Sequence, residues 1–181
     1  MQIDRTPEIT FDRATPSDAE RIGDLLDEAA RWHKGQGIEM WEPGSFEEDV
    51  RGTIAAGDLS VARQDGAVVG CFMLDEGSPR LTRWLAEHGR EPTPGVVGRL
   101  AVTRDMAGRG LGLQLLAEAD RLAAALGIAF LRLECPSDNE GLRRYYLEAG
   151  FTHCGDNDRP GPNGEPWVSS IFERPTGSSA G

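Results

Sequence analysis

The sequence predicts a single α/β domain in which helices cover both faces of a mixed β-sheet. Apolar residues recur at strand spacing in some segments and at helical spacing in others, in the order β-α-α-β-β-β-α-β-α-β-β. An Asp65-Gly66 turn is typical of a hairpin between two of the strands. Gly57, Gly127 and Gly150 stand where three of the helices are expected to end.

The first half of the chain contains three expected strands and two helices. The strands are expected at Ile9–Ala14, Leu59–Gln64 and Ala67–Leu74. Thr15 caps the first helix, and Pro16 suits its first position. A shorter helix is expected from Ser45, where Glu48 completes a capping box. Residues 76–95 hold three prolines and are expected to be irregular, although Trp84, Leu85 and His88 indicate a short helical turn.

The second half contains four expected strands and two helices. The strands are expected at Val96–Val102, Phe130–Cys135, Phe151–Gly155 and Trp167–Phe172, and the helices at Gly110–Leu126 and Gly141–Ala149. The domain therefore spans residues 9–174, and residues 1–8 and 175–181 are expected to be loose tails.

Composition narrows the function classes. A formal net charge of −11 repels nucleic-acid phosphates and favours cationic partners such as amines. No apolar run approaches the roughly 18 residues of a membrane span, and the first residues do not resemble a secretory signal, so no membrane partner and a cytoplasmic location are expected. The three cysteines form no CxxC pair, which disfavours metal binding. Cys71 and Cys135 are expected to be small core residues.

A glycine-rich turn between a strand and a helix is the segment with the clearest chemical meaning. Gly108, Gly110 and Gly112 lie where a helix start would expose unpaired N–H groups, a natural site for phosphate. No Lys follows the glycines, so a P-loop is excluded. The dinucleotide-binding pattern GxGxxG also matches poorly, because the glycines are spaced two apart and residue 113 is Leu. A tight turn that serves packing alone remains the alternative at this point.

Two segments resemble the GNAT superfamily of acetyltransferases. The apolar strand, the short turn and Ala107–Gly112 resemble its motif A, [QR]-x-x-G-x-[GA] at a helix start. The strand Leu131–Cys135, then Asn139, Tyr146 and Gly150-Phe151, resemble its motif B. The resemblance implies a largely antiparallel sheet with a splayed central pair of strands, Val96–Val102 and Phe130–Cys135.

The resemblance also implies acetyl-coenzyme A as co-substrate, with no metal. Main-chain groups of Leu100, Ala101 and Val102 would bind the pantetheine arm, and Asn139 would start a helix and reach the same arm. The pyrophosphate would lie on the turn formed by Ala107, Gly108, Arg109, Gly110, Leu111, Gly112 and Leu113. Ala107 departs from the usual Gln or Arg, a charge that Arg109 could replace.

For catalysis, the resemblance places Tyr146 beside the departing sulfur as the general acid. A phenol, with a reference pKa of about 10, is protonated at neutral pH. Tyr145 is expected to pack in the core, because adjacent helical residues point about 100° apart. No motif identifies the base: Glu39, Asp75 and Glu134 are acidic residues near the expected cleft, and a water chain is equally suitable. Trp41 and Trp84 are candidates for the acceptor pocket.

The leading function is transfer of an acetyl group to a primary amine, either a small cationic amine or a peptide amino group, by direct attack. A non-catalytic acyl-coenzyme A-binding or regulatory module on the same fold is the first alternative, and a nucleotide-binding domain of another class is the second. A homodimer is compatible with all three. The acceptor's identity follows from no motif in the chain.

Overall fold

A seven-stranded sheet runs through the molecule in the computed structural model, which describes residues 8–92, 95–160 and 164–177. The strand order is β1-β2-β3-β4-β5-β7-β6. The strands are β1 (Ile9–Arg13), β2 (Leu59–Gln64), β3 (Ala67–Asp75), β4 (Val96–Val102), β5 (Phe130–Pro136), β6 (Thr152–Pro160) and β7 (Pro166–Pro175). The helices are α1 (Ala19–Gly35), α2 (Glu47–Ala56), α3 (Pro79–Glu87), α4 (Leu111–Ala125) and α5 (Glu140–Glu148), with short 3-10 turns η1 (Pro16–Asp18) and η2 (Arg104–Met106).

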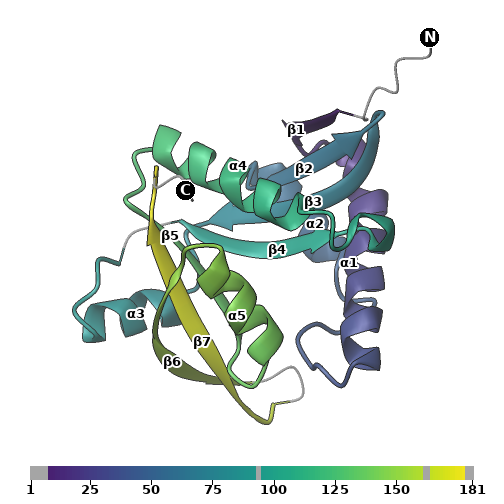
Figure 1. Ribbon diagram of the computed structural model, residues 1–181. Helices are drawn as coiled ribbons and strands as arrows, with labels where there is room; N and C mark the ends of the chain where they lie inside the picture. Colours follow the sequence, from purple (N-terminus) through teal and green to yellow (C-terminus); the bar gives the residue numbers. More distant parts are fainter. Residues whose placement is uncertain (1–7, 93–94, 161–163, 178–181) are drawn as a thin grey trace.

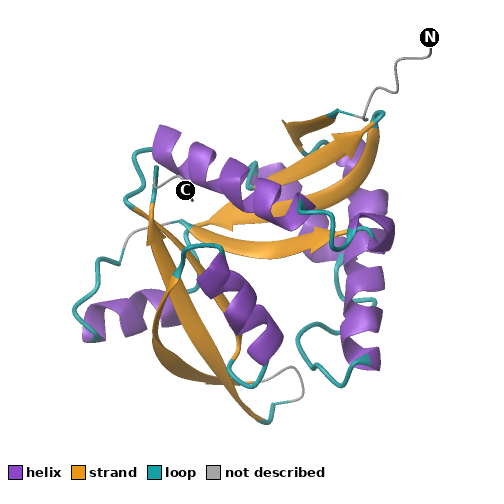
Figure 2. Cartoon of the chain, viewed as in Figure 1, coloured by secondary structure: helices purple, strands orange, loops and turns teal. Residues whose placement is uncertain are grey.

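The sheet is antiparallel except at its centre. β4 and β5 run parallel and share one bridging pair, Val96 with Arg132. Beyond that pair the two strands diverge (Figure 2). The predicted α/β class and the splayed central strand pair are therefore confirmed.

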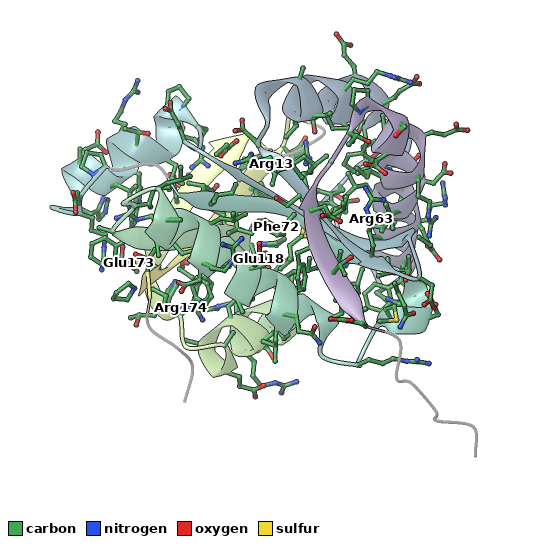
Figure 3. The ribbon with its side chains drawn as sticks, turned by 90° about the horizontal axis from the view of Figure 1, so that it is seen from above. Arg13, Arg63, Phe72, Glu118, Glu173 and Arg174 are labelled. Carbon is green, nitrogen blue, oxygen red and sulfur yellow. The ribbon has the colours of Figure 1, made fainter. Side chains whose placement is uncertain are left out.

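Two separate apolar clusters hold the helices on opposite faces of the sheet (Figure 1). On one face, α4 and α5 pack over the fully buried Phe72, which lies near the middle of the molecule in Figure 3. On the other face, α1 and α2 pack over β2 and β3. The alternating inward and outward residues of the strands supply both clusters. The buried Cys71 belongs to one cluster and Cys135 to the other, as expected for small core residues.

The helix starts follow the predicted signals at two positions. Thr15 is the N-cap of the turn that leads into α1, and Pro16 occupies its first position. Gly110 is the N-cap of α4 in a left-handed conformation with φ 80°, which a glycine adopts without steric cost. α4 therefore begins at the glycine turn that the sequence singled out.

The expectation of an irregular segment at residues 76–95 was wrong, because α3 occupies its middle. Ser78 caps α3 by accepting a hydrogen bond from the Leu81 N–H at 3.2 Å, and Pro79 follows at the first position. Leu81, Trp84 and Leu85 share one face and pack on Ile171 of β7. The prolines that suggested an irregular segment therefore start a helix at one end and follow it at the other.

The structure differs from the predictions at three other boundaries. α2 begins at Glu47 without the expected capping box, because the Ser45 hydroxyl donates instead to the Glu42 carbonyl at 2.7 Å. β6 and β7 form a longer hairpin than predicted. Residues 175–177, expected to belong to a loose tail, bond to the domain: the Thr176 hydroxyl donates to the Ile128 carbonyl and the Gly177 N–H to Asp120.

Candidate functional site

A cleft of about 490 Å³ opens where β4 and β5 diverge. Its lining joins the two faces of the sheet, because Tyr146 and Leu142 come from α5 while His33 and Trp41 come from the α1 side. Beyond Val96, the edge of β4 that faces the cleft has no ladder partner on β5 among the described residues. Such an edge offers N–H and C=O groups to an extended ligand.

β4 is also distorted where it borders the cleft. Its pairing with β3 shifts register, so that Arg99 and Leu100 together oppose the single residue Phe72. Arg99 has φ 50°, a rare conformation for a residue other than glycine. A bulge of this kind changes the direction of the side chains and main-chain groups beside it. Both Arg99 and Leu100 line the cleft, whereas Ala101 is buried and Val102 pairs with Gly70.

The glycine turn supplies open N–H groups at the start of α4. The first hydrogen bond of this helix runs from the Gln114 N–H to the Gly110 carbonyl at 3.2 Å. The amides of Leu111, Gly112 and Leu113 therefore lie at the open end of the helix, where the dipole is positive. Gly108 and Gly110 both have positive φ, and no atom lies within 4 Å of the point that a β-carbon would occupy on either, which leaves room for a phosphate to approach.

The side chains around this turn are consistent with an anion site made mainly by the backbone. Arg109 is exposed and Ala107 is half-buried with no charge to contribute. Leu113 is 48% exposed on the first turn of α4. These placements fit a pyrophosphate held by main-chain amides.

Adjacent tyrosines of α5 point in different directions, as the helix geometry requires. Tyr146 is buried, lines the cleft and packs its ring against Phe172 at 5.7 Å between centroids. Burial raises the pKa of its phenol well above the usual 10, with a smaller contribution from Cys135. The half-buried Tyr145 instead places its hydroxyl against Gly112, 2.5 Å from where a β-carbon would lie. A larger residue at position 112 would therefore displace the Tyr145 hydroxyl.

Of the two polar atoms in the Asn139 side-chain amide, only the oxygen makes a hydrogen bond among the described residues. Its Oδ1 accepts a hydrogen bond from the Leu142 N–H at 3.0 Å and caps α5. Its Nδ2 is buried and has no hydrogen-bond partner in the part of the chain that the structure describes. A buried amide donor without a partner is costly, so this group fits a ligand acceptor. Asn139 is not itself in the cleft lining, but Pro136 and Leu142, three residues to either side, are.

The structure separates the two tryptophans proposed for the acceptor pocket. Trp41 lines the cleft, whereas Trp84 is buried against Ile171, stacks on His88 and packs over Gly155. Trp84 therefore holds α3 on the sheet. Of the three acidic residues considered as bases, Asp75 and Glu134 line the cleft, and the exposed Glu39 does not.

Several cleft residues were missed by the sequence reasoning. Met40, Met73, Leu81 and Trp167 are apolar members of the lining, and no spacing in the chain relates them. His33 lines the cleft as well, and its Nδ1 is buried without a partner among the described residues. Burial, followed by the charge of Arg104, lowers the pKa of His33, so its imidazole is neutral at pH 7.

Neither metal ligation nor a membrane span is found in the described part of the chain. Residues 8–92, 95–160 and 164–177 contain no group of three or more His, Cys, Asp or Glu side chains that could hold a metal ion. The helices described there are too short or too polar to cross a membrane.

Comparison with known proteins gives a consistent result. Residues 24–151 match the model of the acetyltransferase (GNAT) family. The chain is 31% identical over 151 residues to YesJ, an uncharacterized N-acetyltransferase of Bacillus subtilis, covering 78% of this chain and 81% of that protein.

Solved structures share the fold at lower sequence identity. A GNAT-family acetyltransferase from Listeria monocytogenes superposes with a TM-score of 0.73 at 23% identity, covering 94% of this chain and 96% of that one. The protein yncA of Salmonella typhimurium, solved with its cofactor acetyl-CoA, gives a TM-score of 0.66 at 18% identity, with 96% of each chain covered.

Proposed function

Because the chain belongs to the GNAT acetyltransferase family, we propose that it transfers an acetyl group from acetyl-coenzyme A to a primary amine, a small cationic amine or a peptide amino group. The observation that carries this proposal is that Tyr146 lines the cleft beside the open edge of β4, the strand that leads into the glycine turn at the start of α4. The open amides of α4 would hold the pyrophosphate, and the unpaired edge of β4 and Asn139 would hold the pantetheine arm.

Acetyl-coenzyme A supplies a thioester, whose carbonyl carbon is open to direct attack by an amine. The nitrogen forms a bond to that carbon, the carbon–sulfur bond breaks, and the sulfur leaves as a thiolate. The nitrogen loses a proton to a base or to water in the cleft. The enzyme's tasks are therefore to align the two substrates and to stabilise the departing sulfur.

Tyr146 is suited to the second of these tasks. Its raised pKa keeps the phenol protonated at neutral pH, so a proton is available in the cleft. A thiol has a pKa of about 8.5, so complete transfer from this phenol to the thiolate runs uphill. We therefore expect the hydroxyl to stabilise the leaving sulfur by donating a hydrogen bond, while the thiolate takes its proton from water after it has left the cleft.

The function is tested with two measurements on the same preparation. Calorimetric titration with acetyl-coenzyme A should show binding that neither ATP nor NAD displaces. A free-thiol assay over a panel of amines and short peptides should then show thiol release that depends on the acceptor. Binding without any acceptor-dependent release would identify a non-catalytic acyl-coenzyme A module, and displacement by ATP or NAD would identify another class of nucleotide-binding domain.

A further inference from the structure

The cleft continues past Tyr146 onto the sheet face that α1 and α2 cover. Met73 packs against the α1 and α2 cluster, and Asp75, two residues later on β3, shares its face. We call this end of the cleft the acceptor chamber. It is lined by His33, Met40, Trp41, Met73, Asp75 and Leu81.

Two arginines near this chamber, Arg99 and Arg80, are paired with acids. Arg99 contacts Asp49 through Nε at 2.9 Å and Nη2 at 2.8 Å. Arg80 donates to both oxygens of Glu134, at 2.9 and 3.0 Å. At these contacts a substrate carboxylate would have to compete with Asp49 for Arg99 and with Glu134 for Arg80.

Asp75 is the acid of the chamber for which the described residues provide no ion pair. Its Oδ1 accepts a hydrogen bond from the Gly77 N–H at 2.7 Å. Burial raises the pKa of Asp75, the Gly77 hydrogen bond and the charge of Arg99 oppose the shift, and the charges of Asp58 and Glu76 add to it. A half-buried carboxylate surrounded by other acids gains stability from a bound cation.

The rest of the chamber is apolar and aromatic. Trp41 contacts His33 and Phe46 edge to face, with ring centroids 6.1 and 5.8 Å apart, and these contacts fix its position. Met40, Met73 and Leu81 add apolar surface beside it. Such walls favour an uncharged substrate body over a polyamine with several charges.

We propose that the acceptor chamber binds a primary amine carried on an apolar or aromatic body that has no carboxylate, with the ammonium group on Asp75. This inference rests on the proposed function, since it names the acceptor of the same site. It predicts that amines are preferred to the corresponding amino acids, because a carboxylate beside the ammonium would lie near the Asp75 carboxylate and be repelled by it.

The test measures binding of three probes of similar shape to the chain loaded with coenzyme A, by calorimetry. Phenethylamine should bind about tenfold or more tightly than 2-phenylethanol, which lacks the charge, and than phenylalanine, which adds a carboxylate. Asp75→Asn should weaken phenethylamine by about tenfold and leave 2-phenylethanol unchanged. The asparagine Oδ1 can still accept the Gly77 N–H, so the turn is retained. Glu76→Gln is the matched control: Glu76 is exposed, does not line the cleft and should tolerate the same loss of charge.

Equal affinities of the wild-type chain for the amine and the alcohol would overturn the proposal, whatever the variants do. Preference for phenylalanine, or equal losses in Asp75→Asn and Glu76→Gln, would overturn it as well. Coenzyme A carries no acetyl group, so binding is measured without transfer. Amine binding with no thiol release from acetyl-coenzyme A would therefore count against the proposed function and leave the acceptor class supported.

Discussion

The two ends of the cleft are built from different kinds of structure. The proposed cofactor end comes from one stretch of chain, residues 96–151, and consists of main-chain groups along the edge of β4 and, past the cleft lining, at the start of α4. The acceptor end combines side chains from α1, the segment after it, the end of β3 and the start of α3. A backbone site needs a local pattern of glycines, whereas a side-chain site needs only that distant residues meet. The first kind is therefore visible in a sequence and the second is not.

Removal of the Tyr146 hydroxyl, between the two ends of the cleft, should have the largest effect on the enzyme, a loss of turnover. Tyr146→Phe keeps the packing against Phe172 but removes the donor to the leaving sulfur. We expect kcat to fall by roughly 10²–10⁴-fold while the Kd for acetyl-coenzyme A changes little. Tyr145→Phe is the control and should retain its turnover, because its hydroxyl lies against Gly112. Equal losses in the two variants would show that the wrong face of α5 had been assigned to the cleft.

A negative charge placed at the glycine turn should have the next largest effect, a loss of affinity for acetyl-coenzyme A. Gly110→Asp introduces an acid at the start of α4, where a pyrophosphate would bind, and should weaken binding by about 1–2 kcal/mol, or roughly 5- to 30-fold in Kd. Gly110→Asn imposes a similar backbone cost at φ 80° without the charge. Calorimetry on both variants isolates the electrostatic part. The same Kd in the Gly110→Asp and Gly110→Asn variants would show that no phosphate binds at this turn.

A buried ion pair outside both ends provides a stability reference. Asp18 accepts a hydrogen bond from Arg63 at 2.8 Å, and this contact, the largest cause, lowers the pKa of Asp18 to about 2. A lowered folded-state pKa means that the contribution is complete above the unfolded pKa and is lost as the pH falls toward 2. Asp18→Asn should therefore reduce the free energy of unfolding by about 1 kcal/mol at pH 7, a value discounted for solvent screening.

Chemical denaturation of Asp18→Asn and the wild-type chain across pH tests this directly. The difference between them should be constant from pH 7 down to about pH 5 and should shrink below pH 4. Binding of acetyl-coenzyme A should be unaffected at pH 7, because Asp18 lies away from the cleft lining. A difference that grows on acidification would contradict the assigned direction of the pKa shift.

A positive charge introduced at position 107, where the family usually has Gln or Arg, should have the smallest effect on the affinity for acetyl-coenzyme A. Ala107→Arg adds a guanidinium beside a site that main-chain amides already form, and an exposed ion pair contributes about 1 kcal/mol or less. We expect the Kd for acetyl-coenzyme A to fall by roughly fivefold at most, and less at high salt. A much larger gain by calorimetry would mean that the side chain, and not the backbone, dominates the cofactor end.

Elements that depend on local sequence were predictable, whereas the meeting of distant side chains was not. The strands, α4, α5 and the glycine turn were predictable because each depends on local periodicity, a cap or a turn residue. α3 was predicted only as a short helical turn at Trp84, because Pro79 was taken as a sign of irregular structure. Ser78-Pro79 before Leu81 is in fact the helix start. Only part of the acceptor chamber was predicted: Trp41 and Asp75 were named because the resemblance places the cleft near them. Met40 and Leu81 meet these residues only after β3 and α3 have folded beside α1, and no spacing relates them.

The most direct test of this division is the amide NMR spectrum of the chain during titration, first with coenzyme A and then with phenethylamine. Coenzyme A should shift the amides of Leu111, Gly112 and Leu113 at the start of α4 and those along the cleft edge of β4. Phenethylamine should then shift residues 33–41 and 75–81 and leave the start of α4 nearly unchanged. Coenzyme A shifts confined to other segments, with Leu111, Gly112 and Leu113 unmoved, would contradict the backbone site at the centre of this account.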